Sequence, residues 1–443
     1  MSLNKKSQQP NVRALAKEVL LRIEHAGQYS NLALDTAICR SHLSGADRSL
    51  LTALVYGVTE RRLTLDYIID ALANCKGDDI DAETRTALRL GILQIGYMDR
   101  IPAHAAVNES VRLAPHKSAG FVNAILRTYL RRDGQIPFPD RKKDPLLYLS
   151  VSTSVPLPLC RRMADIFGLE KAETILASSL SCDKSGADVR VNTLKITPEA
   201  LEKELKSLDI SVSALEGLPE GLHLCPPGTG SDAFHAGLFT VQDTASQYAC
   251  AVLDPQPGQI MIDACACPGS KSFTAAMRMK NRGHIYACDL HENKLSLVHD
   301  GAKRLGITIL ETVCADGRIE RPQWKESADR VLCDVPCSGY GVIAKKPEIR
   351  YKDPADTVKL PGVQYAILQN CSGYLKKGGR LVYSTCTLLP EENQDIVKRF
   401  LSENPSFRPE AFTVGHYNAP GGMLLLTPDQ GSDGFFIACM TKQ

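Results

Sequence analysis

The features that mark membrane, secreted and disulfide-rich proteins are missing from this chain. It has no run of eighteen apolar residues, and Met1 to Lys6 lack the apolar stretch of a secretory signal. Its 15 cysteines are odd in number and include no Cys-x-x-Cys pair, which argues against a disulfide framework and against a structural zinc site. We therefore expect a soluble cytoplasmic protein with neither a metal nor a membrane attachment.

The chain also carries little net charge, but that charge is unevenly distributed. The whole chain has a net charge of +2, whereas residues 1–150 hold 21 Lys plus Arg against 16 Asp plus Glu. Six basic residues gather near the end of this part: Arg127, Arg131, Arg132, Arg141, Lys142 and Lys143. Such a cluster suits a polyanion surface, although a solvated helix end and linker explain it equally well.

A chain of 443 residues exceeds what one core usually fills, so we expect two or three domains. Apolar stripes at helical spacing predict an all-helical domain over 1–140, and proline with charge predicts a linker over 133–145. Short β-like runs around one helical stretch predict a small α+β module over 148–241. From 242 to 443, strands and helices alternate.

The alternation in the last segment predicts an α/β fold with a parallel, doubly wound sheet, whose ligands lie at the carboxyl ends of the strands. Five short apolar runs are the expected strands: Ile260 to Ala264, His284 to Leu290, Ile309 to Ala315, Arg330 to Val335 and Arg380 to Thr385. The expected helices between them include Glu292 to Leu305 and Gln364 to Leu375.

The first of these strands runs into a tight turn that contains Pro268 and Gly269, and a helix is expected to start near Ser272. Such a turn brings backbone N–H groups close to a ligand at the helix N-terminus. It is not a GxGxxG fingerprint, which weakens the competing interpretation as an NAD-type dehydrogenase.

Acidic residues follow the first three strands and indicate what this ligand is. Asp289 stands where such folds hold ribose hydroxyls, and Asp316 is placed to accept from an adenine amino group. Taken singly, each acid is equally well explained as a loop residue that caps the next helix. Together they disfavour a polyphosphate and favour a cationic adenosine compound, for which S-adenosylmethionine meets all requirements.

Two cysteines follow the fourth and fifth strands, Cys337 after Asp334-Val335-Pro336 and Cys386 after Tyr383-Ser384-Thr385. Methylation of a pyrimidine at C5 needs a nucleophile at C6, a task for one thiolate, and then a base for the C5 proton, a task for the second. Two buried strand-end cysteines, or a redox pair, are the alternatives that the residues leave open.

Two further residues fit a pyrimidine substrate. An ionised Asp334 prefers a base edge that donates hydrogen bonds, which favours cytosine over uracil. Lys271 is expected either to pair with Asp334 or to lower the pKa of a thiol, unless it is only a solvated lysine at a helix start.

These residues stand in three motifs: Asp263-x-Cys265-Ala266-x-Pro268-Gly269-x-Lys271, Asp334-x-Pro336-Cys337-Ser338-Gly339-x-Gly341-Val342 and Tyr383-x-Thr385-Cys386-x-x-x-Pro390-Glu391-Glu392-Asn393. Together they resemble the RsmB (Sun/Fmu) group of RNA cytosine-C5 methyltransferases, over essentially the whole chain. The run Gly27 to Asn31, with Asp47-Arg48 and Leu54 to Gly57, is similar to the NusB-like helical domain of that group. The tail Gly431 to Phe436 is similar to its closing hairpin.

The resemblance implies a Rossmann-like methyltransferase domain that uses S-adenosylmethionine, preceded by a small RRM-like module and a NusB-like RNA-binding domain. It implies 16S ribosomal RNA as the partner, naked or in an early small-subunit particle, and we take a monomer as the default. By position, Cys386 is then the nucleophile, Cys337 assists proton removal and product release, Asp334 orients the base and Lys271 supports Asp334. The implied cofactor site comprises Cys265, Ala266, Cys267, Pro268, Gly269, Ser270, Lys271, Asp289, Asp316 and Asp334.

Two positions depart from the family pattern: relatives usually have Ala at position 267 and Gly at position 270, where this chain has Cys267 and Ser270. If position 270 requires a left-handed backbone, Ser costs about 1 kcal/mol more than Gly. The departures motivate one alternative, a non-catalytic RNA-binding or ribosome-assembly factor whose methyltransferase domain no longer turns over.

Overall fold

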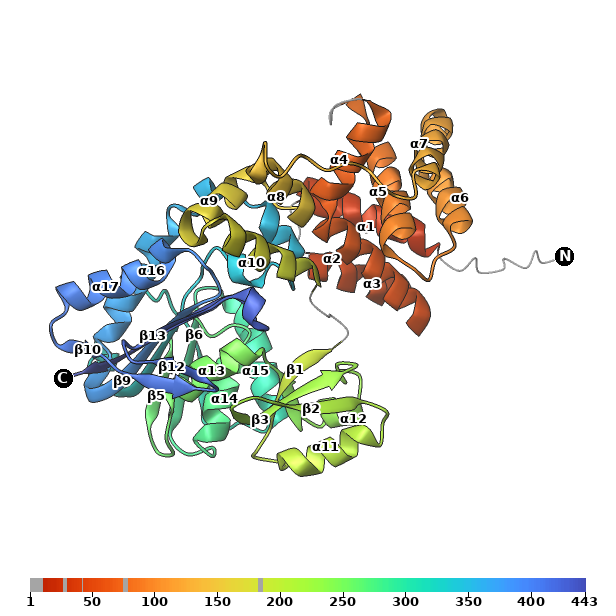
Figure 1. The fold of residues 1–443 in the computed structure, drawn as a ribbon. Helices are drawn as coiled ribbons and strands as arrows, with labels where there is room; N and C mark the ends of the chain where they lie inside the picture. Colours follow the sequence, from red (N-terminus) through yellow and green to blue (C-terminus); the bar gives the residue numbers. More distant parts are fainter. Residues whose placement is uncertain (1–10, 27–29, 42, 75–78, 182–185) are drawn as a thin grey trace. The chain divides into compact units, whose positions relative to one another are not determined.

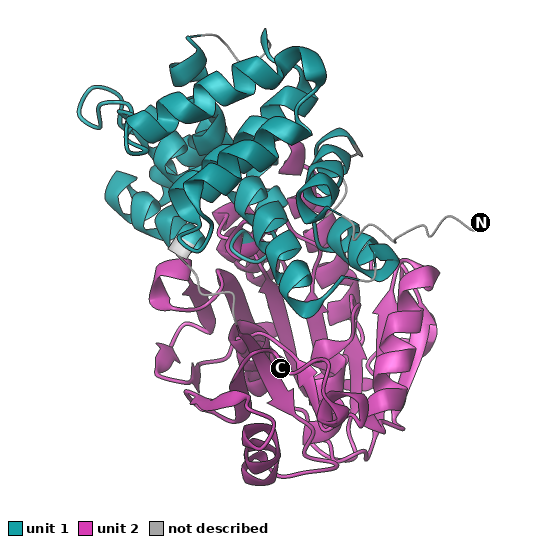
Figure 2. Ribbon diagram, turned by 90° about the vertical axis from the view of Figure 1, so that its right-hand side faces the viewer, with its two compact units in different colours: residues 1–181, 343–354 teal, residues 182–342, 355–443 magenta. Residues whose placement is uncertain are grey.

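The computed structural model describes residues 11–26, 30–41, 43–74, 79–181 and 186–443. Part of the motif expected in the NusB-like domain, Gly27 to Tyr29, lies outside the described residues. The chain forms two compact units (Figure 2). Unit 1 comprises residues 1–181 together with 343–354, and unit 2 comprises residues 182–342 together with 355–443.

Unit 1 is helical throughout its described part (Figure 1). Its α-helices are α1 (Val12–Ala26), α2 (Ser30–Ser41), α3 (Gly45–Glu60), α4 (Arg62–Ala73), α5 (Ala82–Tyr97), α6 (Ala103–Leu113), α7 (Ala119–Arg131), α8 (Pro145–Thr153), α9 (Leu157–Phe167) and α10 (Leu169–Ser181). The apolar stripes that predicted helices, such as Leu51, Leu54 and Val55, are fully buried in its core. Helix α5 runs through the centre, with side chains buried on all faces from Thr84 to Gln94.

The segment 343–354 comes from the second half of the chain but belongs to unit 1. Its short helix η5 (Pro347–Tyr351) carries Arg350, which is fully buried and donates to Thr153 O at 3.1 Å and to Ile343 O at 3.2 Å. The hydroxyl of Tyr351 donates to Thr59 O at 2.6 Å. We call this segment the strap.

Unit 2 begins with a small antiparallel sheet in the order β2-β3-β1-β4. Its elements are β1 (Ala187–Val191), α11 (Pro198–Lys206), β2 (Ser211–Leu215), β3 (Leu218–Cys225), α12 (Asp232–His235) and β4 (Phe239–Val241). Buried Asn192, just after β1, donates to Gly237 O and to Leu305 O, both at 2.8 Å. One amide thus ties the module to the end of α15 (Glu292–Leu305), the helix that leads into β7 of the larger sheet.

The larger sheet of unit 2 has the order β10-β14-β9-β8-β5-β6-β7, with β13 paired to β14. The parallel strands are β5 (Ile260–Asp263), β6 (His284–Asp289), β7 (Leu310–Cys314), β8 (Ala328–Asp334) and β9 (Leu375–Thr385), and the antiparallel ones are β10 (Phe407–Pro409), β13 (Met423–Leu426) and β14 (Phe435–Lys442). A separate hairpin joins β11 (Phe412–Val414) to β12 (Tyr417–Ala419). The expected parallel sheet is confirmed, and the antiparallel strands extend it at one edge.

Helices α13 (Thr244–Leu253), α14 (Ser270–Arg278), α16 (Leu360–Ser372) and α17 (Gln394–Glu403), together with α15, complete unit 2. Two apolar clusters pack on the larger sheet: one contains side chains of α13, α14 and α15, and the other contains side chains of α16 and α17. Strand residues alternate between the clusters, with Met261 in the first and Ile262 in the second, as expected for strands buried on both faces. No helix within the described ranges is long and apolar enough to cross a membrane.

Candidate active site

Four aspartates lie at the carboxyl edge of the parallel strands. Asp263 ends β5, Asp289 ends β6, Asp334 ends β8, and Asp316 follows the end of β7 by two residues. Because β8, β5, β6 and β7 are consecutive neighbours, these residues form a row along one edge of the sheet. The structure thus brings together Asp289, Asp316 and Asp334, as the sequence predicted, and it adds Asp263 to the row.

The turn after Asp263 leads directly into α14, which begins at Ser270, two residues earlier than predicted. Gly269 has a φ of +107°, and a Cβ added there would lie 2.4 Å from Cζ of Phe273. The left-handed position is therefore Gly269, and Ser270 is not among the residues with positive φ. The condition under which Ser270 would cost stability is not met, so its departure from glycine carries no backbone penalty.

Asp263 is a buried acid at the base of this turn. The hydroxyl of Ser272 donates to its Oδ2 at 2.6 Å, whereas its buried Oδ1 has no hydrogen-bond partner within the described part of the chain. Burial raises the pKa of Asp263 to about 7. A buried carboxyl oxygen without a donor marks a place where a ligand group can complete the bonding.

The other two acids on this side have partners in their own loops. Oδ1 of Asp289 accepts from the backbone N–H of His291 at 2.9 Å. Arg318 donates to both carboxylate oxygens of Asp316, and this hydrogen bonding lowers the pKa of Asp316. Asp316 therefore remains available as a carboxylate.

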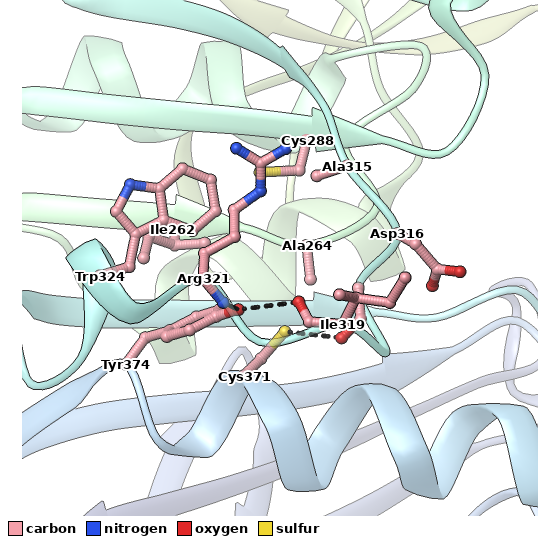
Figure 3. Close-up of a pocket in the computed structure, with 11 residues that line it drawn as sticks. Ile262, Ala264, Cys288, Ala315, Asp316, Ile319, Arg321, Trp324, Cys371 and Tyr374 are labelled. Atoms are coloured by element: carbon pink, nitrogen blue, oxygen red, sulfur yellow. Dashed lines mark hydrogen bonds between the residues drawn. The ribbon is translucent and has the colours of Figure 1, made fainter.

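A small cavity lies behind Asp316, with room for about one water molecule. Figure 3 shows Asp316 at its rim, with the carboxylate turned away from Trp324 and Tyr374. The lining includes residues that the sequence did not single out: Ile262, Ala264, Cys288, Ala315, Gly317, Ile319, Arg321, Trp324, Cys371 and Tyr374. A ligand ring next to Asp316 would therefore lie outside this cavity.

The two cysteines predicted to share a pocket do lie together. Cys337 Sγ and Cys386 Sγ are 3.2 Å apart, and both residues are half-buried. They meet because β8 and β9 are parallel neighbours with Asp334 opposite Ser384, so that the loops after the two strands start side by side. The hydrogen bond with Cys386 and burial both raise the pKa of Cys337 well above its usual value.

Asp334 lies at the base of these two loops and is held on both oxygens. The hydroxyl of Ser384 donates to Oδ1 at 2.7 Å, and Nζ of Lys271 donates to Oδ2 at 2.8 Å. Burial alone would lower the pKa of Lys271, but the charge of Asp334 and its hydrogen bond outweigh burial and raise that pKa. The predicted pairing of Lys271 with Asp334 is thus present, and Lys271 is an ammonium group.

Hydrogen bonds connect the two thiol loops to each other. The hydroxyls of Ser338 and Thr387 are 2.6 Å apart, and the backbone N–H of Gly341 donates to Cys386 O at 2.9 Å. Gly434, in the loop before β14, donates from its N–H to Gly341 O at 2.8 Å. The spacing of the sulfur atoms therefore does not depend on the sulfur–sulfur contact alone.

Sequence reasoning assigned no role to three residues that hold these loops. Asn393 brackets Cys386: its Oδ1 accepts from the hydroxyl of Thr385 at 2.5 Å, and its Nδ2 donates to Thr387 O at 2.9 Å. Glu392 and Gln364 bond to the residues on either side of Cys337. The run Pro390 to Asn393 carried a signal, since it belongs to a quoted motif, whereas nothing in the sequence distinguishes Gln364.

The residues of this edge fit a cationic adenosine-type cofactor. Carboxylates suit hydroxyl, amino and sulfonium groups, the turn before α14 places a helix N-terminus at the same edge, and Asp263 Oδ1 has an unused acceptor. No group of three His, Cys, Asp or Glu side chains in the described ranges is arranged to hold a metal ion. The site therefore combines two thiols with an edge that can bind an organic cation.

Comparisons with known proteins identify the family of the chain. The family described as 16S rRNA methyltransferase RsmB/F matches residues 250–441, and the NusB family matches residues 10–131. The probable ribosomal RNA small subunit methyltransferase B of Bacillus subtilis is 36% identical over 98% of this chain and 99% of its own length. The corresponding protein of Vibrio cholerae is 31% identical over 98% of each chain.

Solved structures show the same fold. The crystal structure of PH0851 covers 98% of this chain and 100% of its own, with 26% identity and a TM-score of 0.79. A methyltransferase homolog protein from Pyrococcus horikoshii covers 68% of this chain and 99% of its own, with 28% identity and a TM-score of 0.58. The chain therefore belongs to the RsmB/F family of ribosomal RNA small subunit methyltransferases, in agreement with the resemblance of its three motifs.

Proposed function

We propose that this protein forms 5-methylcytosine in 16S ribosomal RNA through a transient covalent bond between Cys386 and C6 of the target cytosine. S-adenosylmethionine is the cofactor of this methyltransferase and supplies, when bound, an electrophilic methyl group on a cationic sulfur. The observation that carries the proposal is the distance of 3.2 Å between the sulfur atoms of Cys337 and Cys386.

The nucleophilic step requires a thiolate at Cys386. Its sulfur bonds to C6, the electron pair of the C5–C6 double bond moves to C5, and C5 takes the methyl group, whose former bonding pair stays on the cofactor sulfur. Loss of the C5 proton then returns an electron pair to the ring, and the C6–sulfur bond breaks to restore the thiolate and the double bond. Cys337, next to Cys386, assists this proton removal and the release of the product.

Asp334 orients the base in this scheme. Lys271 and Ser384 each occupy one lone pair on different oxygens of Asp334, so acceptor capacity remains for the amino group and a protonated N3 of a cytosine. The ammonium group of Lys271 forms an ion pair with this carboxylate. A uracil, which presents a carbonyl oxygen at C4, would face this carboxylate unfavourably.

The cofactor lies along the row of acids. Asp289 binds the ribose hydroxyls and Asp316 the adenine amino group, while the turn from Cys265 to Ser270 approaches the cofactor with its backbone. Asp334 and Lys271 face both the cofactor and the base. The positions of these residues at adjacent strand ends support this assignment.

The RNA partner suits the charge of unit 1. The six basic residues at the end of α7 and in the following segment are all exposed, and we assign them to backbone phosphates. The protein acts as a monomer on the RNA, naked or in an early small-subunit particle, and the target base leaves its stack to reach the thiols.

Variants of the two cysteines test the mechanism. With 16S RNA and S-adenosylmethionine, Cys337→Ala should accumulate a protein–RNA adduct that survives denaturation, because release is impaired. Cys386→Ala should form neither adduct nor 5-methylcytosine. Denaturing gels and nucleoside mass spectrometry measure both products, with Cys39→Ala, an exposed cysteine of unit 1, as the matched control. An adduct in the Cys386→Ala protein would overturn the assignment of the nucleophile.

A further inference from the structure

Glu392 is a fully buried carboxyl group beside the thiols for which the mechanism above has no use. It ends the short helix η7 (Pro390–Glu392), six residues after Cys386. Its Oε2 accepts from the backbone N–H of Ser338 at 2.9 Å and from Nε2 of Gln364 at 2.7 Å. Its Oε1 is buried and has no hydrogen-bond partner in the part of the chain that the structure describes.

These bonds hold the loop of Cys337 from both sides. Nε2 of Gln364 also donates to Pro336 O at 3.0 Å, so that Pro336 is bound by Gln364 and Ser338 by Glu392. The backbone of Glu392 is itself fixed, because the hydroxyl of Tyr383 donates to Glu392 O at 2.6 Å. Cys337 therefore lies between two residues, Pro336 and Ser338, whose backbone groups are held by these hydrogen bonds.

We call the hydrogen bonds that Glu392 and Gln364 form with the loop of Cys337 the clamp. The clamp alone does not require a charge at position 392. The amide oxygen of a glutamine accepts from Ser338 N–H equally well, and it avoids the unfavourable burial of a carboxylate that has two donors and one unpaired oxygen. What a glutamate adds is negative charge. The charge of Glu392 contributes to the raised pKa of Cys337, after the larger effects of the Cys386 hydrogen bond and burial.

Two thiols 3.2 Å apart share one hydrogen bond, so when one proton is lost the remaining proton stays on one of the two sulfurs. We propose that Glu392 is a positioning residue that assigns the roles of the thiols. It fixes the loop of Cys337, and before the substrate binds its negative charge keeps the shared proton on Cys337, so that Cys386 carries the thiolate. Once Cys386 has bonded to C6, Cys337 loses this proton to solvent and can then take the proton from C5. This inference rests on the proposed function, in which Cys386 is the nucleophile.

The titratable groups that face Cys337 come from three elements: Cys386 from the loop after β9, Glu392 from η7 and Tyr383 from β9. Lys271, the nearby cation of the mechanism, is bound to Asp334. A change in the charge of Glu392 therefore acts on the thiol pair directly.

Alkylation of the free protein measures where the thiolate resides. A thiolate displaces iodide from iodoacetamide and forms a thioether, which peptide mass spectrometry locates at Cys337 or Cys386. In the unmodified protein Cys386 should react first, and at lower pH than Cys337. Glu392→Gln keeps the acceptor and removes the charge, so the ratio of Cys337 to Cys386 alkylation should rise about tenfold for each pKa unit that the pair shifts.

Three variants separate charge from shape. Glu392→Asp keeps the charge and should restore the ratio, whereas Gln364→Leu loosens the clamp and should lower methylation without moving the alkylation to Cys337. Asp395→Asn, an exposed acid at the start of α17, should change neither property. Thermal unfolding and S-adenosylmethionine binding by calorimetry establish that each variant is folded.

An unchanged alkylation ratio in folded Glu392→Gln would overturn the inference. If that variant does not fold, the pH dependence of alkylation in the unmodified protein decides, because a Cys337 that reacts at lower pH than Cys386 contradicts the proposal. This readout needs no RNA and no turnover. An adduct in Cys386→Ala would instead refute the proposed function, whatever the alkylation shows.

Discussion

Asp263 links the cofactor turn to the pH dependence of stability. Burial raises its pKa from 3.8 to about 7, so the folded state holds a proton on Asp263 that the unfolded chain releases between these values. Stability should therefore fall as pH rises from about 4 to about 7 and level off above, by an upper bound of about 4 kcal/mol. Asp263→Asn, which still accepts from Ser272, should lack this contribution.

Urea unfolding at several pH values measures this effect, as the difference between the unmodified protein and Asp263→Asn. Asp316→Asn is the matched control, because hydrogen bonding to Arg318 lowers the pKa of Asp316 and its contribution has the opposite sign. Parallel stability curves for the unmodified protein and Asp263→Asn would show that Asp263 titrates as an ordinary acid.

At the residue scale, the sequence predicted the site residues that directly follow a strand and missed those whose partners are distant in the chain. Asp289, Asp334, Cys337 and Cys386 were predicted together because each follows an apolar run, and the ends of parallel strands meet at one edge. Gln364 escaped prediction because its partners are a backbone carbonyl and a carboxylate that are each 28 residues away. Such bonds follow from the packing of α16 against the loop and leave no local pattern.

Among the elements, the loop after β8 depends on the close approach of two glycines. A Cβ added to Gly341 would lie 1.9 Å from Gly434 O and 2.9 Å from Cys386 O. Gly341→Ala should therefore push the Cys337 loop away from the Cys386 loop and lower kcat at least about tenfold, since small displacements of reacting groups cost about that much or more. Steady-state methylation assays measure this loss.

Gly362→Ala is the control for this substitution. Gly362 lies in α16, and an added Cβ there has no neighbour within 4 Å. This variant should keep its activity and gain about 0.5–1 kcal/mol of stability, because alanine favours the helix. Full activity in Gly341→Ala would mean that the two thiol loops do not need the glycine contact.

Prediction of the elements succeeded where apolar runs were short and separated. Helix α15 has the predicted bounds, and β5 to β7 end within one residue of them. Helices α8, α9 and α10 were not predicted, since the expected α+β module began at 148 and included only one helical stretch, which lies further along the chain. The sequence of α8, Pro-Leu-Leu-Tyr-Leu-Ser-Val-Ser-Thr, has apolar residues on every face, so it shows no helical periodicity.

At the scale of the whole molecule, the order of the chain does not match its compact units. The predicted domain boundaries treat 242–443 as one piece, whereas residues 343–354 group with the helices of unit 1. The chain therefore passes between the units three times. Periodicity cannot reveal such a segment, because membership in a unit depends on contacts with residues about 170 to 300 positions away, such as Thr59 and Ser179.

The strap makes the stability of unit 1 depend on a residue from the second half of the chain. Arg350 is fully buried, and Arg350→Ala would remove the donor that serves Thr153 O, Ser179 Oγ and Ile343 O. Each buried acceptor that loses its donor costs about 1–3 kcal/mol, so unit 1 should lose about 3 kcal/mol or more. Arg399→Ala, an exposed arginine of α17, should change stability by less than about 1 kcal/mol.

Two spectroscopic probes separate the units in this experiment. The chain has one tryptophan, Trp324, which lies buried in unit 2, so its fluorescence reports the unfolding of unit 2. Far-ultraviolet circular dichroism reports the helices of both units. In Arg350→Ala, the dichroism should lose part of its amplitude at lower temperature, while the fluorescence transition of Trp324 stays in place. If both probes shift together, the two units unfold in one cooperative transition.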